Sequence, residues 1–247
     1  MEIWQAIVLG IVQGLTEFLP ISSSGHLIIF PWLLDWETPG LSFDAALHLG
    51  TLVAVVVYFR DLIWRMILAI PVALQNPLGI LRGTAAGSSE RHIDARMGLL
   101  IVIASFPAGI AGLLLESRID EFFHAEDAST RAITTIATMM IVVAGVMFLA
   151  EKVGQRSKDI PRMKWLDALI VGLAQAVALI PGTSRSGATI SAGLFRGLKR
   201  EDAASFSFLA GIPLVAAAGL KSVADAIGEG MTRHEMWLFL SGGISAA

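Results

Sequence analysis

The feature that most constrains this chain is a series of apolar segments, each of roughly 17 to 25 residues, that recur along its whole length. A helix of that length is needed to cross a hydrocarbon core of about 30 Å, because each helical residue rises about 1.5 Å. Of the residues, 55% are hydrophobic and 16% are charged, against about 25% charged in a soluble domain. The sequence therefore predicts an all-α polytopic membrane protein in which residues 1–247 form a single transmembrane domain.

Composition also excludes several classes of function. The chain has no cysteine, which excludes disulfide bonds, thiolate catalysis and cysteine-ligated zinc. Its formal net charge is -3 and its basic residues are scattered, so we expect no nucleic acid ligand. The expected partner is a lipid or a small solute.

The apolar segments are of two kinds. Five are expected to span or nearly span the membrane: 44–59, 97–115, 132–149, 203–220, and one from residue 236 to the end. Segments 3–19 and 165–180 are instead each followed by proline and a cluster of serine and glycine, and the apolar pieces beyond, 27–34 and 190–198, are too short to cross a bilayer. A helix, a break and a short helix predict a re-entrant helical hairpin, which needs protein or water around its irregular backbone.

The charges between the segments predict orientation. Stretches 60–96 and 152–164 are rich in Lys and Arg and should be cytoplasmic, whereas loop 116–131 is acidic and should face outward. On this topology the first hairpin enters from the outer side and the second from the inner side. Two hairpins of opposite orientation predict an inverted repeat whose tips meet near the bilayer midplane.

The sequence itself repeats in agreement with that topology. Repeat 1 is expected at about 1–150 and repeat 2 at about 163–247, the second lacking counterparts of later spans and so expected to be truncated at its C-terminus. A shift of 162 residues brings four pairs of identical residues into register: Gln13 with Gln175, Ser22 with Ser184, Ser24 with Ser186, and Gly25 with Gly187.

The first break carries candidate catalytic residues. Gln13 and Glu17 are four residues apart and share one helix face. An acid within an apolar segment is costly and is by default a functional candidate, although it could also snorkel or pair with an arginine. After it come Ser22, Ser23 and Ser24, then Gly25 and His26.

These serines precede the N-terminus of a short helix, whose unpaired N–H groups and positive dipole favour an anion. The alternative is that they are small packing residues, as serines in membrane helices often are. A lone histidine is most often a satisfied interior residue. Three residues after Ser23, however, His26 could act as acid or base. Asp44 and His48 lie near a span end, where solvated or capping roles are expected.

The second break supplies an arginine within the membrane. Arg185 stands between Ser184 and Ser186, with Thr189 four residues further on. A guanidinium there needs an anion, and its fork suits the oxygens of a phosphate. The charge, the hydroxyls and the helix N-termini all indicate a phosphorylated group as ligand.

Segments 13–26 and 181–189 resemble the two signature segments of the undecaprenyl pyrophosphate phosphatase family, the bacitracin-resistance proteins of bacteria. This family has Glu or Gln at position 13, so Gln13 is permitted but one carboxylate is lost. The resemblance implies a multi-pass protein of the bacterial inner membrane that hydrolyses undecaprenyl pyrophosphate, recycling the lipid carrier of peptidoglycan synthesis. The site is expected to open to the outer, periplasmic side.

The resemblance also implies residue roles. Ser23 is the expected nucleophile, His26 its acid or base, Glu17 a base, orienter or metal ligand, and Arg185 the phosphate clamp. Mg²⁺ or Ca²⁺ is the expected cofactor, membrane lipids are expected partners, and a homodimer is compatible with the sequence. The rival function is a polyprenyl-phosphate transporter or flippase, because inverted repeats with a midplane anion site also build transporters. The expected substrate-binding residues are Gln13, Ser22, Ser24, Gly25, Ser184, Ser186 and Thr189.

Overall fold

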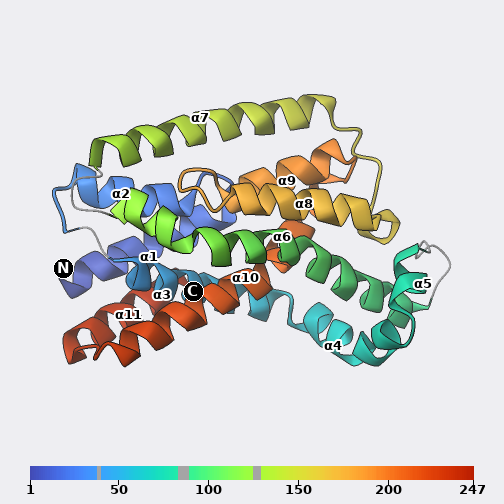
Figure 1. The fold of residues 1–247 in the computed structure, drawn as a ribbon, viewed down its shortest axis with the longest axis horizontal. Helices are drawn as coiled ribbons and strands as arrows, with labels where there is room; N and C mark the ends of the chain where they lie inside the picture. The colour runs from blue at the N-terminus through green and yellow to red at the C-terminus, as the bar shows by residue number, and fades with distance from the viewer. Residues whose placement is uncertain (38–39, 83–88, 125–128) are drawn as a thin grey trace.

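The apolar segments form helices, and the parts of the chain that are described contain no β-strand, only an isolated bridge between Lys158 and Leu198. The computed structural model describes residues 1–37, 40–82, 89–124 and 129–247 (Figure 1). Its helices are α1 (Ile3–Phe18), α2 (Ser23–Leu33), α3 (Leu41–Tyr58), α4 (Arg60–Gln75), α5 (Pro77–Arg82), α6 (Glu90–His124), α7 (Ser129–Val153), α8 (Trp165–Val177), α9 (Arg185–Phe195), α10 (Arg200–Gly228) and α11 (Arg233–Ala246), with a 3-10 turn at Ile160–Arg162.

Among the described residues, three helices are long and apolar enough to cross a membrane: Glu90–Leu115, Thr130–Val153 and Arg200–Gly228. They contain the expected spans 97–115, 132–149 and 203–220, and the expected segments 44–59 and 236 onward fall largely in α3 and α11. The helical nature of these five segments is confirmed. The expected loop 116–131 is partly wrong, because α6 continues to His124, and residues 125–128 lie outside the described part of the chain.

Both serine-rich breaks have the same local structure. The second short helix of each pair begins after an N-cap serine with positive φ, 70° at Ser22 and 43° at Ser184. Each cap hydroxyl accepts a hydrogen bond from the backbone N–H three residues on, at Gly25 and at Gly187. A serine cap of this kind satisfies one of the free donors at a helix N-terminus. The breaks are therefore ordered turns with a shared geometry.

One expected connection is instead a pair of helices. The sequence between residues 60 and 96 was expected to link two spans, yet α4 and α5 occupy much of it and pack on α6. Arg60, Asp61 and Arg65 lower the hydropathy of this stretch, and Pro71 falls within it, so hydropathy does not indicate a helix here. Helix α4 nevertheless continues through Pro71 and buries Ala69 and Ala73. An ion pair of 3.4 Å between Arg65 and Asp94 joins α4 to α6.

Small residues allow the helices to approach closely. Gly172 of α8 lies against the backbone of Ala104 in α6, and Gly50 of α3 lies against the backbone of Gly243 in α11. Such contacts are typical of helices packed in a membrane, where small residues let backbones meet. In Figure 1, α7 runs along one side of the molecule next to α9, while α11 lies on the opposite side against α1 and α3.

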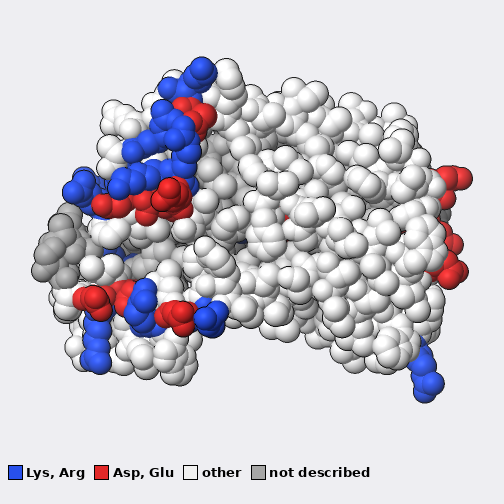
Figure 2. All heavy atoms as spheres, turned by 180° about the vertical axis from the view of Figure 1, so that it is seen from behind, with Lys and Arg blue, Asp and Glu red and all other residues white. Residues whose placement is uncertain are grey.

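On the face shown in Figure 2, the exposed charged side chains lie at the two ends of the molecule. Figure 2 shows Lys and Arg gathered, with some Asp and Glu, at one end, a wide uncharged band, and mainly Asp and Glu at the other end. The described parts of the basic stretches 60–96 and 152–164 lie toward the same end of the ribbon, where α4, α5 and the start of α8 are found (Figure 1). An uncharged band between two charged ends fits a protein embedded in lipid.

Candidate active site

Glu17 near the end of α1 is the centre of the polar cluster. Its side chain is 8% exposed, and its Oε1 accepts a hydrogen bond of 2.6 Å from Nη2 of Arg185 on α9. Its Oε2 accepts bonds from the hydroxyl of Ser23 on α2, at 2.7 Å, and from Nε2 of Gln13, at 3.2 Å. The structure thus brings together four of the predicted site residues from both breaks.

Arg185 links three helices. Besides the ion pair with Glu17, its Nη1 donates to the carbonyl of Ser207 on α10 at 3.3 Å. The hydroxyl of Ser186 donates to the backbone carbonyl of Glu17 at 3.5 Å, a second contact between the breaks. A guanidinium has five N–H groups, more than these bonds use, so the fork can also bind a phosphate oxygen.

The remaining serines lie at the starts of the two short helices. Ser22 and Ser24 are 3.4 Å apart through their hydroxyl oxygens, and Ser184 and Ser186 are also 3.4 Å apart. The serines stand where helix N-termini present N–H groups and positive dipole, an arrangement that favours phosphate. Thr189 is placed differently, because its hydroxyl donates to the carbonyl of Arg185 at 2.7 Å within its own helix.

His26 was expected to act as acid or base on the hydroxyl of Ser23, but the structure shows no hydrogen bond between these two side chains. Its Nδ1 lies 2.7 Å from the carbonyl of Ser22, while the hydroxyl of Ser23 donates to Glu17. Because a carbonyl only accepts, Nδ1 carries the proton and Nε2 is the ring atom left for chemistry. The geometry makes Glu17, rather than His26, the immediate partner of Ser23.

Two residues at this site were missed as site residues. His48 on α3 was expected to be a capping or solvated residue, yet its Nε2 lies 3.6 Å from Oε2 of Glu17. Gly211 on α10 is the residue against which the guanidinium of Arg185 packs, in space that a Cβ would fill. Two features of the sequence could have indicated them. His48 is a histidine inside apolar segment 44–59, and Gly211 stands two residues before Pro213 in apolar segment 203–220.

The donor set for a metal ion is small. Within the described residues, no group of three or more His, Cys, Asp or Glu side chains could hold one. Glu17 supplies a single carboxylate, and beside it Oε1 of Gln13 is a buried oxygen without a hydrogen-bond partner. Mg²⁺ is commonly held by one or two carboxylates together with the phosphates of a substrate. The residues therefore fit a cation only if the substrate supplies further oxygens.

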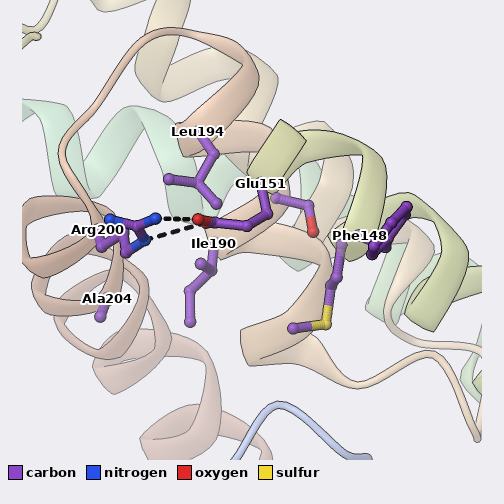
Figure 3. Close-up of a pocket in the computed structure, with 8 residues that line it drawn as sticks. Phe148, Glu151, Ile190, Leu194, Arg200 and Ala204 are labelled. Carbon is purple, nitrogen blue, oxygen red and sulfur yellow. Dashed lines mark hydrogen bonds and ion pairs between the residues drawn. The ribbon is translucent and has the colours of Figure 1, made fainter. Parts of the chain in front are cut away.

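A separate cavity of about 410 Å³ lies between α7, α9 and α10 (Figure 3). Glu151 and Arg200 pair at one side of it, and none of the predicted site residues lines it. Most of its lining is apolar: Met147, Phe148, Ile190, Leu194 and Ala204, with Ser191. The cavity is thus distinct from the cluster around Glu17.

Comparisons with known proteins bear on this cluster. A family model described as bacitracin resistance protein BacA matches residues 6–247. A protein of Thermomicrobium roseum named undecaprenyl-diphosphatase is 48% identical over 247 residues, which is 100% of this chain and 85% of the relative. Proteins of the same name from Idiomarina loihiensis and Synechococcus elongatus are 43% and 40% identical, over 99% and 100% of this chain and 84% and 81% of their own lengths.

The family match and the helices lead to the same conclusion. The match covers nearly the whole described chain, including both serine-rich breaks. In the described part of the chain, three helices have the length and apolar composition of membrane spans. The chain is a multi-pass membrane protein and belongs to the BacA family of bacitracin resistance proteins.

Proposed function

We propose that the chain hydrolyses undecaprenyl pyrophosphate to undecaprenyl phosphate and inorganic phosphate at the cluster around Glu17. This reaction recycles the lipid carrier for peptidoglycan synthesis and accounts for bacitracin resistance. The relatives' name, undecaprenyl-diphosphatase, states the activity. The observation that carries the proposal is the bonding of one carboxylate, Glu17, to both a hydroxyl nucleophile, Ser23, and a phosphate-binding guanidinium, Arg185.

In the proposed reaction, the oxygen of Ser23 attacks the terminal phosphorus. Glu17 takes the hydroxyl proton, and the bond between that phosphorus and the bridging oxygen breaks. Undecaprenyl phosphate leaves, and water then hydrolyses the phosphoserine to release inorganic phosphate. Arg185 stabilises the charge that develops on the phosphate oxygens.

His26 is assigned the role of acid in this scheme. The hydroxyl of Ser23 has one proton, and it is donated to Glu17, so His26 is not needed as a base for Ser23. With Nδ1 donating to the carbonyl of Ser22, Nε2 carries a second proton in the imidazolium form of the ring. His26 in that form can give this proton to the leaving phosphate oxygen and become neutral. The assignment keeps His26 catalytic and moves it from base to acid.

The substrate-binding residues have two roles in the proposal. Ser22, Ser24, Ser184 and Ser186, with the N–H groups of the two short helices, bind the diphosphate oxygens; Gly25 supports the first of these turns through its N–H. Thr189 acts indirectly, since its hydroxyl bonds α9 to Ser207 of α10 at 2.6 Å. Gln13 orients the carboxylate of Glu17.

We also propose a divalent cation, Mg²⁺ or Ca²⁺, that binds with the substrate. Glu17 and the amide oxygen of Gln13 would hold it together with diphosphate oxygens, and it would offset the charge of the diphosphate. Treatment with EDTA is therefore expected to lower the rate of phosphate release by at least about tenfold, and added Mg²⁺ or Ca²⁺ to restore it. Full activity in EDTA would contradict the cation.

The finer architecture is part of the same proposal. The two breaks are proposed as tips of re-entrant hairpins in a single domain with an inverted repeat, with the site open to the periplasm. Their common N-cap geometry at Ser22 and Ser184 supports the repeat, and the contact between Glu17 and Arg185 supports the meeting of the tips. The basic end of the molecule supports a cytoplasmic orientation for that end. The homodimer stays a prediction.

Phosphate release separates the enzyme from the rival transporter. The purified protein in detergent, given undecaprenyl or farnesyl pyrophosphate, is expected to release inorganic phosphate that malachite green detects. Detergent provides no gradient and no second compartment, so a transporter or flippase would release none. Absence of phosphate from folded protein supplied with Mg²⁺ would contradict the proposed function.

Gly211 provides a test of how Arg185 is held. In Gly211→Ala, the added methyl group takes space that the guanidinium occupies, so the arginine must move away from Glu17. We expect the rate of phosphate release to fall at least about tenfold, or ~1.4 kcal/mol of transition-state stabilisation. Gly228→Ala is the matched control on the same helix, because its Cβ meets nothing within 4 Å, and it should keep full activity. Equal activity in the two variants would contradict the packing role of Gly211.

A further inference from the structure

His48 of α3 contacts the catalytic cluster from a helix that neither serine-rich break belongs to. Its Nε2 lies 3.6 Å from Oε2 of Glu17, and the side chains are 25% and 8% exposed. The same oxygen accepts the hydroxyl of Ser23 at 2.7 Å. His48 therefore touches the carboxylate oxygen through which the nucleophile is bonded.

The ring of His48 is fixed in orientation by its own helix. Its Nδ1 lies 2.8 Å from the carbonyl of Asp44, and because a carbonyl only accepts, Nδ1 is the donor. The next turn is also bonded, since Thr51 donates through its hydroxyl to the carbonyl of His48 at 2.9 Å. With Nδ1 donating to the backbone, Nε2 is the atom turned toward Glu17, and it attracts the carboxylate through the N–H that it carries in the imidazolium form of the ring.

The proposed reaction requires Arg185 and Glu17 to act on different partners. The guanidinium bonds Oε1 of Glu17, and in the reaction it must also bind phosphate oxygens. As the phosphate draws the guanidinium, the carboxylate loses support on the Oε1 side, and apart from the bond to Ser23 it is then held by Gln13, which donates to Oε2 at 3.2 Å. A contact on Oε2 that the substrate does not share would keep the carboxylate in place.

We propose that His48 is a positioning residue of the active site, which through Nε2 holds Oε2 of Glu17 toward the hydroxyl of Ser23 during turnover. The proposal rests on the proposed role of Glu17 as the proton acceptor of Ser23. It adds α3 to the elements that build the site, beside α1, α2, α9 and α10. It also gives a function to a histidine in an apolar segment.

A pair of substitutions of similar length tests the contact. Glutamine at position 48 keeps a side-chain N–H that can reach the carboxylate, whereas methionine has a similar size and no such donor. We expect His48→Met to lower kcat at least about tenfold with little change in KM, and His48→Gln to recover most of the loss. His92→Ala, at an exposed histidine bonded to Ser89, is the control and should keep wild-type kinetics.

The measurements separate the possible failures. Melting temperatures in detergent show whether each variant is folded, and phosphate release gives kcat and KM. Equal kcat in His48→Met and His48→Gln, whether high or low, would overturn the positioning role, because the two differ in the N–H donor. Wild-type protein that releases no phosphate would instead contradict the proposed function itself.

Discussion

Replacing Ser23 by alanine is expected to lower the rate of phosphate release by about 10²-fold or more. The substitution removes the hydroxyl that donates to Glu17 at 2.7 Å, and with it the proposed nucleophile. Little else should change, because Ser23 is the first residue of a helix whose cap is the neighbouring Ser22. The check is the malachite-green assay, with the melting temperature in detergent measured on the same preparation.

A second serine serves as the matched control. Ser191 is also buried, but its hydroxyl donates to the carbonyl of Gly187 at 2.7 Å within α9, away from Glu17. Ser191→Ala should therefore keep nearly full activity. Near-normal turnover in Ser23→Ala would remove the nucleophile assignment, since no hydroxyl would then remain at that position to form a phosphoserine.

Replacing Arg185 by lysine is expected to lower the rate by at least about 10²-fold, the cost of losing one donor that stabilises a developing oxyanion. An ammonium keeps the positive charge but lacks the fork, which here reaches both Glu17 and the carbonyl of Ser207. Lysine cannot hold these two groups and a phosphate in one geometry. The rate is measured at saturating substrate, so that weaker binding does not hide the effect.

The same substitution at the other end of α9 is the control. Arg196 pairs through Nε with Asp167 at 2.7 Å and lies outside the cluster around Glu17. Arg196→Lys is expected to retain most of the activity. If Arg185→Lys were also fully active, the arginine would be only a counter-charge for Glu17, and the proposed phosphate clamp would be wrong.

Much of this site could be predicted because its signals are local. Proline followed by serine and glycine interrupts an apolar segment, and the positions of Glu17, Ser23 and Arg185 relative to those interruptions mark them as polar groups in an apolar setting. The structure places both Ser23 and Arg185 in hydrogen-bond contact with Glu17. The helices were predictable for the same reason, since apolar length alone identifies a span.

The missed features depend on contacts between segments far apart in the sequence. His48 is 31 residues from Glu17 in the sequence, and nothing near it shows that its ring faces another helix. Gly211 matters only because the guanidinium of Arg185 packs against it, which no local pattern records. Helix α4 was missed for a different reason, because its charged first turns resemble a cytoplasmic link when hydropathy alone is considered.

Crosslinking between the two breaks tests the central claim, that they form one site. Ser22 precedes Ser23 and Ser184 precedes Arg185, and Ser23 and Arg185 both bond to Glu17. Cysteines at positions 22 and 184 should therefore lie within reach of a short bifunctional thiol reagent. The chain has no cysteine of its own, which leaves the double variant Ser22→Cys, Ser184→Cys free of background. We predict an intramolecular crosslink that a bound pyrophosphate analogue blocks. Cysteines that react independently, from opposite sides of the membrane, and never crosslink would contradict a single site.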